Sequence, residues 1–183
     1  MGAAVQGEIC LANGGFVGDS IVDGPGLRCV VFAQGCPHRC PGCHNTSTWP
    51  FEEGKRTDVQ EIYQRIKGYP LCRGVTFSGG EPFAQAEAFA ALACLLRADK
   101  RYEVAAYTGY TFEEILKGDA AQRSLLSLLD ILVDGRFEEK EKNLSLRFRG
   151  SANQRILNVP ASLAAGEAVY ETAGRWTGGE PHR

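Results

Sequence analysis

Short apolar runs alternate with amphipathic stretches through the middle of the chain. Leu27–Ala33 is apolar and rich in valine, which is typical of a strand buried within a parallel sheet. Three later runs have the same character and predict further buried strands: Val75–Phe77, Tyr102–Tyr107 and Ile131–Val133. Because helical patterns separate these runs, we expect parallel strands joined by crossover helices.

The segments between the predicted strands carry helical periodicity. In Thr57–Lys67, four apolar residues recur at the spacing of one helix face: Val59, Ile62, Tyr63 and Ile66. Thr57, with Gln60 three residues later, fits a capping box at the start of this helix. Three further helices are predicted over Ala84–Arg97, Phe112–Lys117 and Ala121–Leu129.

This order of elements predicts an α/β fold built as a partial, open (β/α) barrel with parallel strands. A complete eight-stranded barrel takes roughly 250 residues. The chain has 183 residues, so the barrel should stay open. In such folds the chemistry lies at the C-terminal ends of the strands, and an open side leaves room for a loop of another protein.

The whole chain, residues 1–183, is expected to form a single domain. Its core is predicted over about residues 15–160. Two additional strands are expected within it, Leu144–Phe148 and Arg155–Val159. The glycine-containing segment after Pro160 is predicted to end as a loose C-terminal tail.

Charge and cysteine content narrow the function classes. Twenty basic and twenty-two acidic residues give a net charge of -2, so no overall positive field would hold a nucleic-acid backbone. Neither a secretory signal nor a membrane span is predicted, because the N-terminus lacks a basic segment followed by a long apolar stretch. The seven cysteines are an odd number, which argues against a disulfide scaffold and favours the reducing cytoplasm.

The densest chemical signal is a cysteine triplet that follows the first predicted strand. Cys36, Cys40 and Cys43 have the spacing C-x3-C-x2-C. An iron-sulfur cluster held by only three cysteines leaves one iron open to another ligand. A structural zinc ion is the alternative, and it needs a fourth ligand. Three residues offer one: Cys29, His38 and His44.

A second signal, the run Gly-Gly-Glu-Pro at Gly79–Pro82, follows the strand predicted over Val75–Phe77. Glycines at a strand exit allow the backbone to approach a ligand closely. An ordinary strand-to-helix turn uses the same residue types, so the run is weak by itself.

Together, and in this order, the two motifs resemble those of the radical S-adenosylmethionine enzymes. Three more segments resemble the glycyl-radical-enzyme activases in particular: Asp23–Arg28, Cys43–Asn45 followed by Trp49, and Tyr107–Tyr110. Within that family, two segments are similar to the subfamily that activates anaerobic ribonucleoside-triphosphate reductase: Cys40–Cys43 and Arg149–Ile156. The resemblance covers about residues 15–159.

The resemblance implies a partial barrel of the radical S-adenosylmethionine type and an oxidoreductase activity. Cys36, Cys40 and Cys43 would be the catalytic and metal-binding residues, holding a 4Fe-4S cluster at which S-adenosylmethionine is cleaved reductively. The 5'-deoxyadenosyl radical would then generate a glycyl radical on the partner, anaerobic ribonucleoside-triphosphate reductase. A small electron donor such as flavodoxin is also implied, whereas no nucleic acid and no membrane are expected as partners.

The same resemblance implies how S-adenosylmethionine is bound. Four residues would meet its methionine end: Ser78, Gly79, Gly80 and Glu81. The superfamily usually carries an aromatic residue just before the third cysteine, where this chain has Gly42. We therefore expect the adenine near the backbone of Gly42 and Cys43, with the His44 ring partly replacing the missing aromatic ring.

Thr108 would line the ribose, and Asp134 and Arg136 would lie near the ribose and the carboxylate. The alternative for Asp134 and Arg136 is an ion pair that closes a strand. Asp23 is either part of a turn or a contact for the partner's glycyl loop.

Several interpretations stay open. The basic residues Arg147, Arg149 and Arg155 form either a solvated strand face or a docking patch. Asn153, Gln154 and Arg155 either line the mouth of the site or brace it, and the sequence does not decide between these roles. The alternatives for the whole protein are an activase of another glycyl radical enzyme, a small-molecule radical enzyme such as a deazaguanine synthase, and a non-catalytic module held by zinc.

Overall fold

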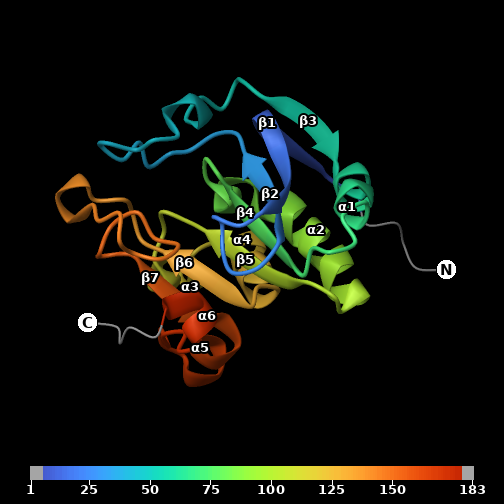
Figure 1. Cartoon of the computed structure of the whole chain (residues 1–183). Coiled ribbons are helices and arrows are strands. Elements are labelled where there is room, and N and C mark those ends of the chain that lie inside the picture. The colour runs from blue at the N-terminus through green and yellow to red at the C-terminus, as the bar shows by residue number, and fades with distance from the viewer. Residues whose placement is uncertain (1–5, 179–183) are drawn as a thin grey trace.

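The structure, a computed structural model, describes residues 6–178 and contains one seven-stranded sheet with the order β3-β1-β2-β4-β5-β6-β7 (Figure 1). The strands are β1 (Glu8–Ser20), β2 (Arg28–Ala33), β3 (Lys55–Asp58), β4 (Gly74–Gly79), β5 (Glu103–Tyr107), β6 (Ile131–Asp134) and β7 (Arg155–Asn158). The α-helices are α1 (Val59–Lys67), α2 (Ala86–Asp99), α3 (Phe112–Leu116), α4 (Ala120–Ser127), α5 (Val159–Ala165) and α6 (Gly174–Thr177). The 3-10 helices are η1 (Thr46–Thr48), η2 (Pro82–Gln85) and η3 (Glu139–Glu141).

The centre of the sheet is parallel and its edges are antiparallel. Strands β2, β4, β5 and β6 run parallel in that order, which confirms the predicted alternation of strands and crossover helices. The prediction of parallel strands does not extend to β1, β3 and β7, which pair antiparallel with their neighbours. The fold is therefore a mixed α/β fold with a parallel centre.

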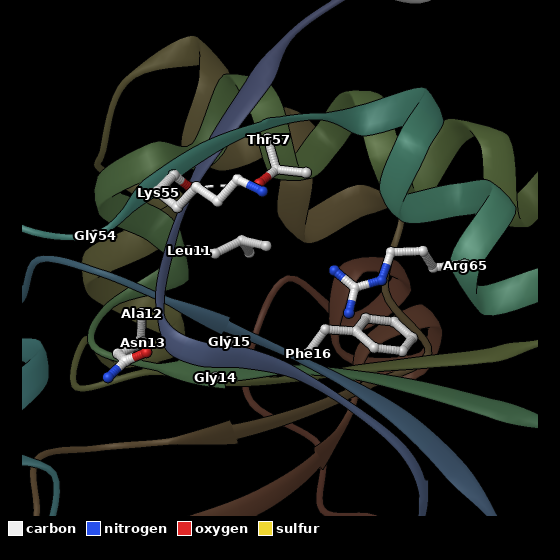
Figure 2. A pocket seen from close by; sticks show the side chains of 10 residues that line it. All are labelled: Leu11, Ala12, Asn13, Gly14, Gly15, Phe16, Gly54, Lys55, Thr57 and Arg65. Atoms are coloured by element: carbon white, nitrogen blue, oxygen red, sulfur yellow. Dashed lines mark hydrogen bonds between the residues drawn. The ribbon is translucent and has the colours of Figure 1, made fainter.

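Strand β1 does not show in the sequence pattern because it is interrupted. Its pairing with β2 shifts between Leu11 and Phe16, where extra residues bulge out of the ladder and Gly14 takes a φ of 68°. A cavity of about 450 Å³ lies beside this bulge (Figure 2). There the Arg65 guanidinium lies 4.4 Å from the centre of the Phe16 ring. The bulge breaks the period-two alternation by which a strand is predicted.

Helices α1, α2 and α4 lie side by side on one face of the sheet (Figure 1). Because side chains alternate along a strand, only every second residue meets these helices. The parallel strands contribute eight such core residues: Cys29, Val31, Ala33, Val75, Phe77, Val104, Ala106 and Leu132. Their neighbours Phe32, Ser78 and Tyr107 face the other side of the sheet and line a large cavity. None of the helices within residues 6–178 has the length and apolar character needed to cross a bilayer.

Helix α1 begins at Val59 and is capped by Asp58, whose Oδ1 accepts a hydrogen bond from the Gln60 N–H at 2.7 Å. The predicted cap at Thr57 is wrong, because Thr57 belongs to β3 and is buried. An aspartate at the following position satisfies the first-turn N–H groups equally well.

The predicted strand Leu144–Phe148 is also wrong. Residues 143–149 form turns at the tip of an excursion closed by the Lys142–Ser151 bridge. Leu146 and Phe148 line the cavity, whereas Leu144 is 91% exposed. Leu146 and Phe148 of this alternating pattern therefore form part of a cavity wall instead of a strand. We call residues 143–150 the excursion.

The segment after Pro160 is folded through residue 178, so it is not a loose tail over that range. Trp176 in α6 is fully buried. Its ring packs edge-on against Phe148, with 5.4 Å between the ring centres, and lies 5.3 Å from the Arg28 guanidinium. A buried tryptophan supplies enough apolar contact to hold so short a helix. The final residues 179–183, for which looseness was expected, lie outside the described residues.

The four parallel strands end at the same edge of the sheet, as expected for parallel neighbours. The segments that leave them are residues 34–45 after β2, 80–81 after β4, 108–109 after β5 and 135–136 after β6. Every motif that the sequence singles out from Cys36 to Arg136 thus lies at a C-terminal strand end, where α/β folds place their chemistry.

Candidate functional site

A cavity of about 590 Å³ opens at this edge of the sheet. Its wall combines the cysteine loop, the exits of β4, β5 and β6, and the excursion. Eight of the predicted site residues lie in the wall: Cys36, Cys40, Cys43, His44, Ser78, Gly79, Gly80 and Thr108. Four lie outside it: Gly42, Glu81, Asp134 and Arg136.

The cysteine loop is fixed at its base by main-chain hydrogen bonds. The N–H of Gly35 donates to the Thr48 carbonyl at 2.8 Å, and the N–H of Cys36 donates to the Trp49 carbonyl at 3.1 Å. Three loop residues have positive φ angles, Gly35 (91°), Arg39 (48°) and Gly42 (75°). These reversals of the chain bring all three cysteines to one wall.

The three cysteines differ in burial but share the cavity. Cys36 is buried, and Cys40 and Cys43 are half-buried. Burial raises the pKa of the Cys36 and Cys40 thiols, so iron would have to displace protons from them. Within residues 6–178, no three His, Cys, Asp or Glu side chains surround one point as a single metal ion requires. A four-iron cluster presents separate irons to separate cysteines, so a wall bearing three sulfurs fits such a cluster.

Gly79 and Gly80 bring the exit of β4 into backbone contact with the exit of β2. The N–H of Gly80 donates to the Ala33 carbonyl at 2.7 Å. A Cβ on Gly79 would lie 2.6 Å from the Ala33 nitrogen and oxygen, and one on Gly80 would overlap the Gly35 carbonyl. The fold therefore requires glycine at both positions, which we call the glycine cradle. Its bare backbone lines the cavity beside the cysteine loop.

The Glu81 carboxylate forms its hydrogen bonds with other residues of the protein, behind the cavity wall. Its Oε1 accepts hydrogen bonds from the Thr108 hydroxyl at 2.9 Å and the Phe83 N–H at 3.0 Å. Its Oε2 accepts one from the Gly109 N–H at 2.8 Å and lies 2.8 Å from His38 Nε2. The side chain is fully buried. The structure thus places Glu81 behind the cavity wall, where it connects the exits of β4 and β5 with the cysteine loop.

His38 is a site residue that the sequence suggests only as a possible zinc ligand. Its side chain is buried, and the ring packs edge-on against Tyr110 with 4.5 Å between ring centres. A Cβ on Gly109 would overlap the ring, so Gly109 makes room for it. The only sequence signal for this role is the position of His38 between the first two cysteines.

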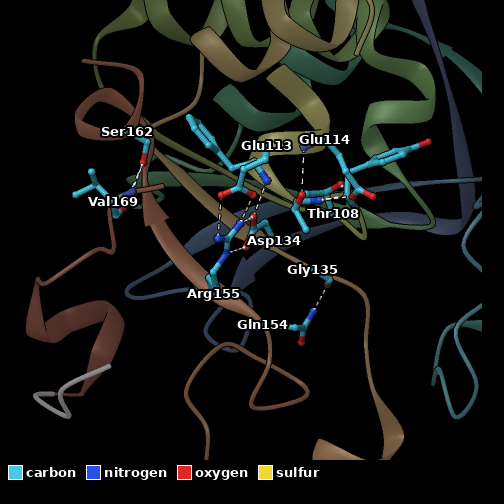
Figure 3. Close-up of polar contacts among 12 residues, drawn as sticks. Thr108, Glu113, Glu114, Asp134, Gly135, Gln154, Arg155, Ser162 and Val169 are labelled. Carbon is cyan, nitrogen blue, oxygen red and sulfur yellow. Dashed lines mark hydrogen bonds and ion pairs between the residues drawn. The ribbon is translucent and has the colours of Figure 1, made fainter. Parts of the chain in front are cut away.

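Asp134 pairs with Arg155 outside the cavity wall (Figure 3). Its Oδ1 accepts a hydrogen bond from Arg155 Nε at 2.9 Å, and its Oδ2 accepts from Arg155 Nη2 at 2.5 Å and from the Phe112 N–H at 2.7 Å. Arg155 also donates to Glu113 at 2.8 Å. Asp134 thus forms an ion pair that joins β6 to β7, with Arg155 and not with Arg136.

Arg136 and Gly42 also face neighbours outside the cavity. The Arg136 side chain is 58% exposed, with its Nη2 4.0 Å from Glu114 Oε1 and its Nε 3.4 Å from His38 Nδ1. A Cβ on Gly42 would lie 2.8 Å from the carboxyl carbon of Glu139. The structure therefore does not bring these two residues together with the cysteines in the wall.

Asn153 and Gln154 fasten the excursion to the exit of β6. Gln154 Nε2 donates to the Gly135 carbonyl at 3.0 Å (Figure 3), and Asn153 Nδ2 donates to the Arg136 carbonyl at 2.8 Å. Gln154 Oε1 also accepts a hydrogen bond from the Gly150 N–H at 2.8 Å. These contacts give the two residues a structural role in closing the cavity.

Comparison with known proteins agrees with this site. The protein family described as a 4Fe-4S single cluster domain matches residues 22–157. The anaerobic ribonucleoside-triphosphate reductase-activating protein of Vibrio cholerae serotype O1 is 40% identical over 146 residues, which cover 74% of this chain and 90% of that protein. The protein of the same name from Pasteurella multocida is 40% identical over 147 residues, with the same coverage.

The solved structure of QueE from Escherichia coli is similar over 58% of this chain and 53% of that chain, with a TM-score of 0.47 and 19% identity. The family match contains the cysteine loop and the glycine cradle, and each of the two relatives is matched over 90% of its own length. The chain therefore belongs to the family of anaerobic ribonucleoside-triphosphate reductase-activating proteins.

Proposed function

We propose that this protein generates a glycyl radical on an anaerobic ribonucleoside-triphosphate reductase by cleaving S-adenosylmethionine at a 4Fe-4S cluster. The observation that supports this most is a cavity wall shared by the three cysteines and the glycine cradle. The cysteines are suited to hold the cluster, and the bare backbone beside them offers carbonyl groups at short range to the ammonium group of S-adenosylmethionine. The names of the relatives support the choice of reductase.

When bound, the cluster supplies the electron that cleaves S-adenosylmethionine into methionine and a 5'-deoxyadenosyl radical, which takes a hydrogen atom from the partner's glycine. The residues of this chain bind and position the reactants. The three cysteines would hold the cluster, and the glycine cradle with the Ser78 hydroxyl would hold the methionine end. His44 and Thr108 would line the nucleoside end. Glu81 and His38 would keep the cysteine loop and the cradle in register.

The entrance to the cavity suits a protein substrate. We propose that the sheet is a partial, open (β/α) barrel of the radical S-adenosylmethionine type, with the cavity on its inner face. Val22 and Asp23 line this cavity from one segment, and Leu146 and Phe148 line it from the excursion. Val22 is 74% exposed, and Leu144, which belongs to the excursion but not to the cavity wall, is 91% exposed. Exposed apolar residues around a cavity favour the binding of a protein segment, here the one that bears the glycine.

We further propose that a small electron donor such as flavodoxin reduces the cluster. We also propose that the chain forms a single domain and is located in the cytoplasm. All seven cysteines are free thiols, which suits a reducing compartment. Pro37 and Arg39 on the cysteine loop are exposed. A donor could therefore approach the cluster from outside while the cavity is occupied.

The test is an anaerobic reaction of the reconstituted protein with S-adenosylmethionine, a reductant and the reductase. Electron paramagnetic resonance should detect a glycyl radical on the reductase, and analysis should find about four irons and four sulfides per chain. Cys36→Ala should lose the intact cluster and the cleavage of S-adenosylmethionine. Cys94→Ala is the matched control, because Cys94 is exposed and outside the cavity wall, and it should keep both.

Two outcomes would contradict the proposal in different ways. One zinc ion per chain, without iron or sulfide, would reject the cluster. A complete cluster that cleaves S-adenosylmethionine but leaves the reductase without a radical would reject this partner.

A further inference from the structure

The three arginines of the basic segment have different surroundings in the structure. Arg155 is paired with Asp134 and Glu113. Arg147 packs at the C-terminal end of α6, where a Cβ on Gly178 would lie 2.9 Å from its side chain. Arg149 alone of the three lines the cavity. The three arginines therefore do not form one basic patch.

Arg149 is the only arginine or lysine among the described residues that line this cavity, and Asp23 is the only carboxylate. The Arg149 side chain uses one of its donors internally, from Nη1 to the Gln154 carbonyl at 3.0 Å. Its Nε is buried and has no hydrogen-bond partner among the described residues. Buried donors of this kind are normally satisfied, so a guanidinium with an unmet donor beside a cavity indicates a missing partner.

The backbone around Arg149 is held firmly. Gln154 Oε1 accepts hydrogen bonds from the N–H groups of Gly150 and Ser151, at 2.8 and 3.2 Å. Gln154 Nε2 in turn donates to the Gly135 carbonyl. With the backbone held in this way, the hydrogen bond from Arg149 Nη1 to the Gln154 carbonyl positions the guanidinium before any ligand enters, which lowers the entropy lost on binding.

Arg136, the basic residue for which the family resemblance implies a place near the carboxylate of the cofactor, does not line this cavity. Its guanidinium is more than half exposed and lies near Glu114 and His38. The cation that the cavity offers to an anionic group is therefore Arg149.

We propose that the Arg149 guanidinium binds the carboxylate of S-adenosylmethionine, in place of Arg136. This rests on the proposed function, because it takes S-adenosylmethionine as the ligand. The carboxylate is the one anionic group of that molecule, and a planar guanidinium is the side chain best suited to a carboxylate. The inference also gives a binding role to the first residue of the Arg149–Ile156 segment.

The test compares two ligands that differ only in the carboxylate. Calorimetry would measure binding of S-adenosylmethionine and of decarboxylated S-adenosylmethionine to the reconstituted protein with an oxidised cluster, so that no cleavage occurs. Arg149→Gln should weaken binding of S-adenosylmethionine about tenfold to a hundredfold, the usual effect of losing a charge-assisted hydrogen bond. Binding of the decarboxylated ligand should stay unchanged. Arg149→Lys should lie between Arg149→Gln and the unaltered protein.

Arg136→Gln is the matched control and should weaken neither ligand. Circular dichroism and iron content would show that each variant is folded and carries its cluster. Equal weakening of both ligands by Arg149→Gln, no weakening at all, or a carboxylate-selective loss in Arg136→Gln would overturn the inference while leaving the proposed function intact. Failure of the unaltered protein to bind S-adenosylmethionine would instead overturn the proposed function, and this inference with it.

Discussion

At the scale of single residues, two separate constraints require glycine at position 79. Its φ of 97° lies in a region that side chains disfavour, and a Cβ would meet the Ala33 backbone at 2.6 Å. Gly14 shares only the first constraint, since its φ is 68° and no atom lies within 4 Å of an added Cβ. The two positions therefore separate backbone strain from close approach.

We expect Gly79→Ala to lower the free energy of unfolding by about 3 kcal/mol, from strain and overpacking together. Gly14→Ala should cost about 1 kcal/mol, from strain alone. Urea unfolding of the cluster-free protein measures both values. Equal losses would show that the contact between the two strand exits tolerates a side chain.

At the scale of elements, β6, β7 and α3 are held together by the ion pairs of Arg155. The pKa of Glu113 is lowered to about 2 from an ordinary value of 4.5, mainly because Arg155 donates hydrogen bonds to its carboxylate. A carboxyl group whose pKa is lower in the folded state stabilises the fold fully above its unfolded value. That contribution disappears as the pH falls from 4.5 towards 2.

Glu113→Gln should therefore lower the Tm at pH 7, by about 2 °C or less because the side chain is half exposed. The difference from the unaltered protein should shrink as the pH falls from 4.5 to 2, which thermal melts across this range would measure. Glu52→Gln, in an exposed loop, is the control. A difference in Tm that does not change with pH would contradict the linkage.

The sequence predicts elements best where burial is complete. Strands β2, β4, β5 and β6 are short apolar runs, and all four are found close to their predicted bounds. Strand β1 was not predicted, because its bulge breaks the alternation, and β3 is a short edge strand of charged residues. In the excursion a strand was predicted where none exists. Its apolar residues alternate because some of them line the cavity, and they have no partner strand.

In the candidate site, too, some features can be predicted from the sequence and others cannot. The cysteine triplet and the glycine run are local motifs, so their positions follow from spacing and from the strands before them. The contact between His38 and Glu81 joins residues 43 apart in the chain, and the pair of Asp134 and Arg155 joins residues 21 apart. Such contacts depend on which strand exits become neighbours, and the sequence pattern does not specify this at the level of side chains.

At the scale of the whole molecule, the C-terminal segment packs through Trp176 on Ala105, Ile131 and Val133 of the parallel strands. Trp176 packs beside Arg28, which is itself buried. Arg28 donates from Nε to the Thr76 hydroxyl at 2.7 Å and from Nη1 to Glu103 at 2.8 Å. The last helix therefore stabilises the beginnings of the parallel strands, whereas the site lies at their ends.

Trp176→Ala should lower the free energy of unfolding by about 3–5 kcal/mol, because it leaves a large cavity beside a buried arginine. Leu163→Ala in α5 is the control, since Leu163 is 38% exposed, and it should cost much less. Denaturant unfolding measures both. A similar loss in the two variants would mean that α6 adds little to the stability of the fold.

The internal position of the Glu81 carboxylate has a consequence for protein design. A cysteine loop transplanted alone to another scaffold would lose the acid that holds His38, and that acid in turn needs donors from the Thr108 and Gly109 segment. The smallest portable unit of the cysteine loop and the glycine cradle is therefore the stretch from the end of β2 to Tyr110, with the strands that align its loops.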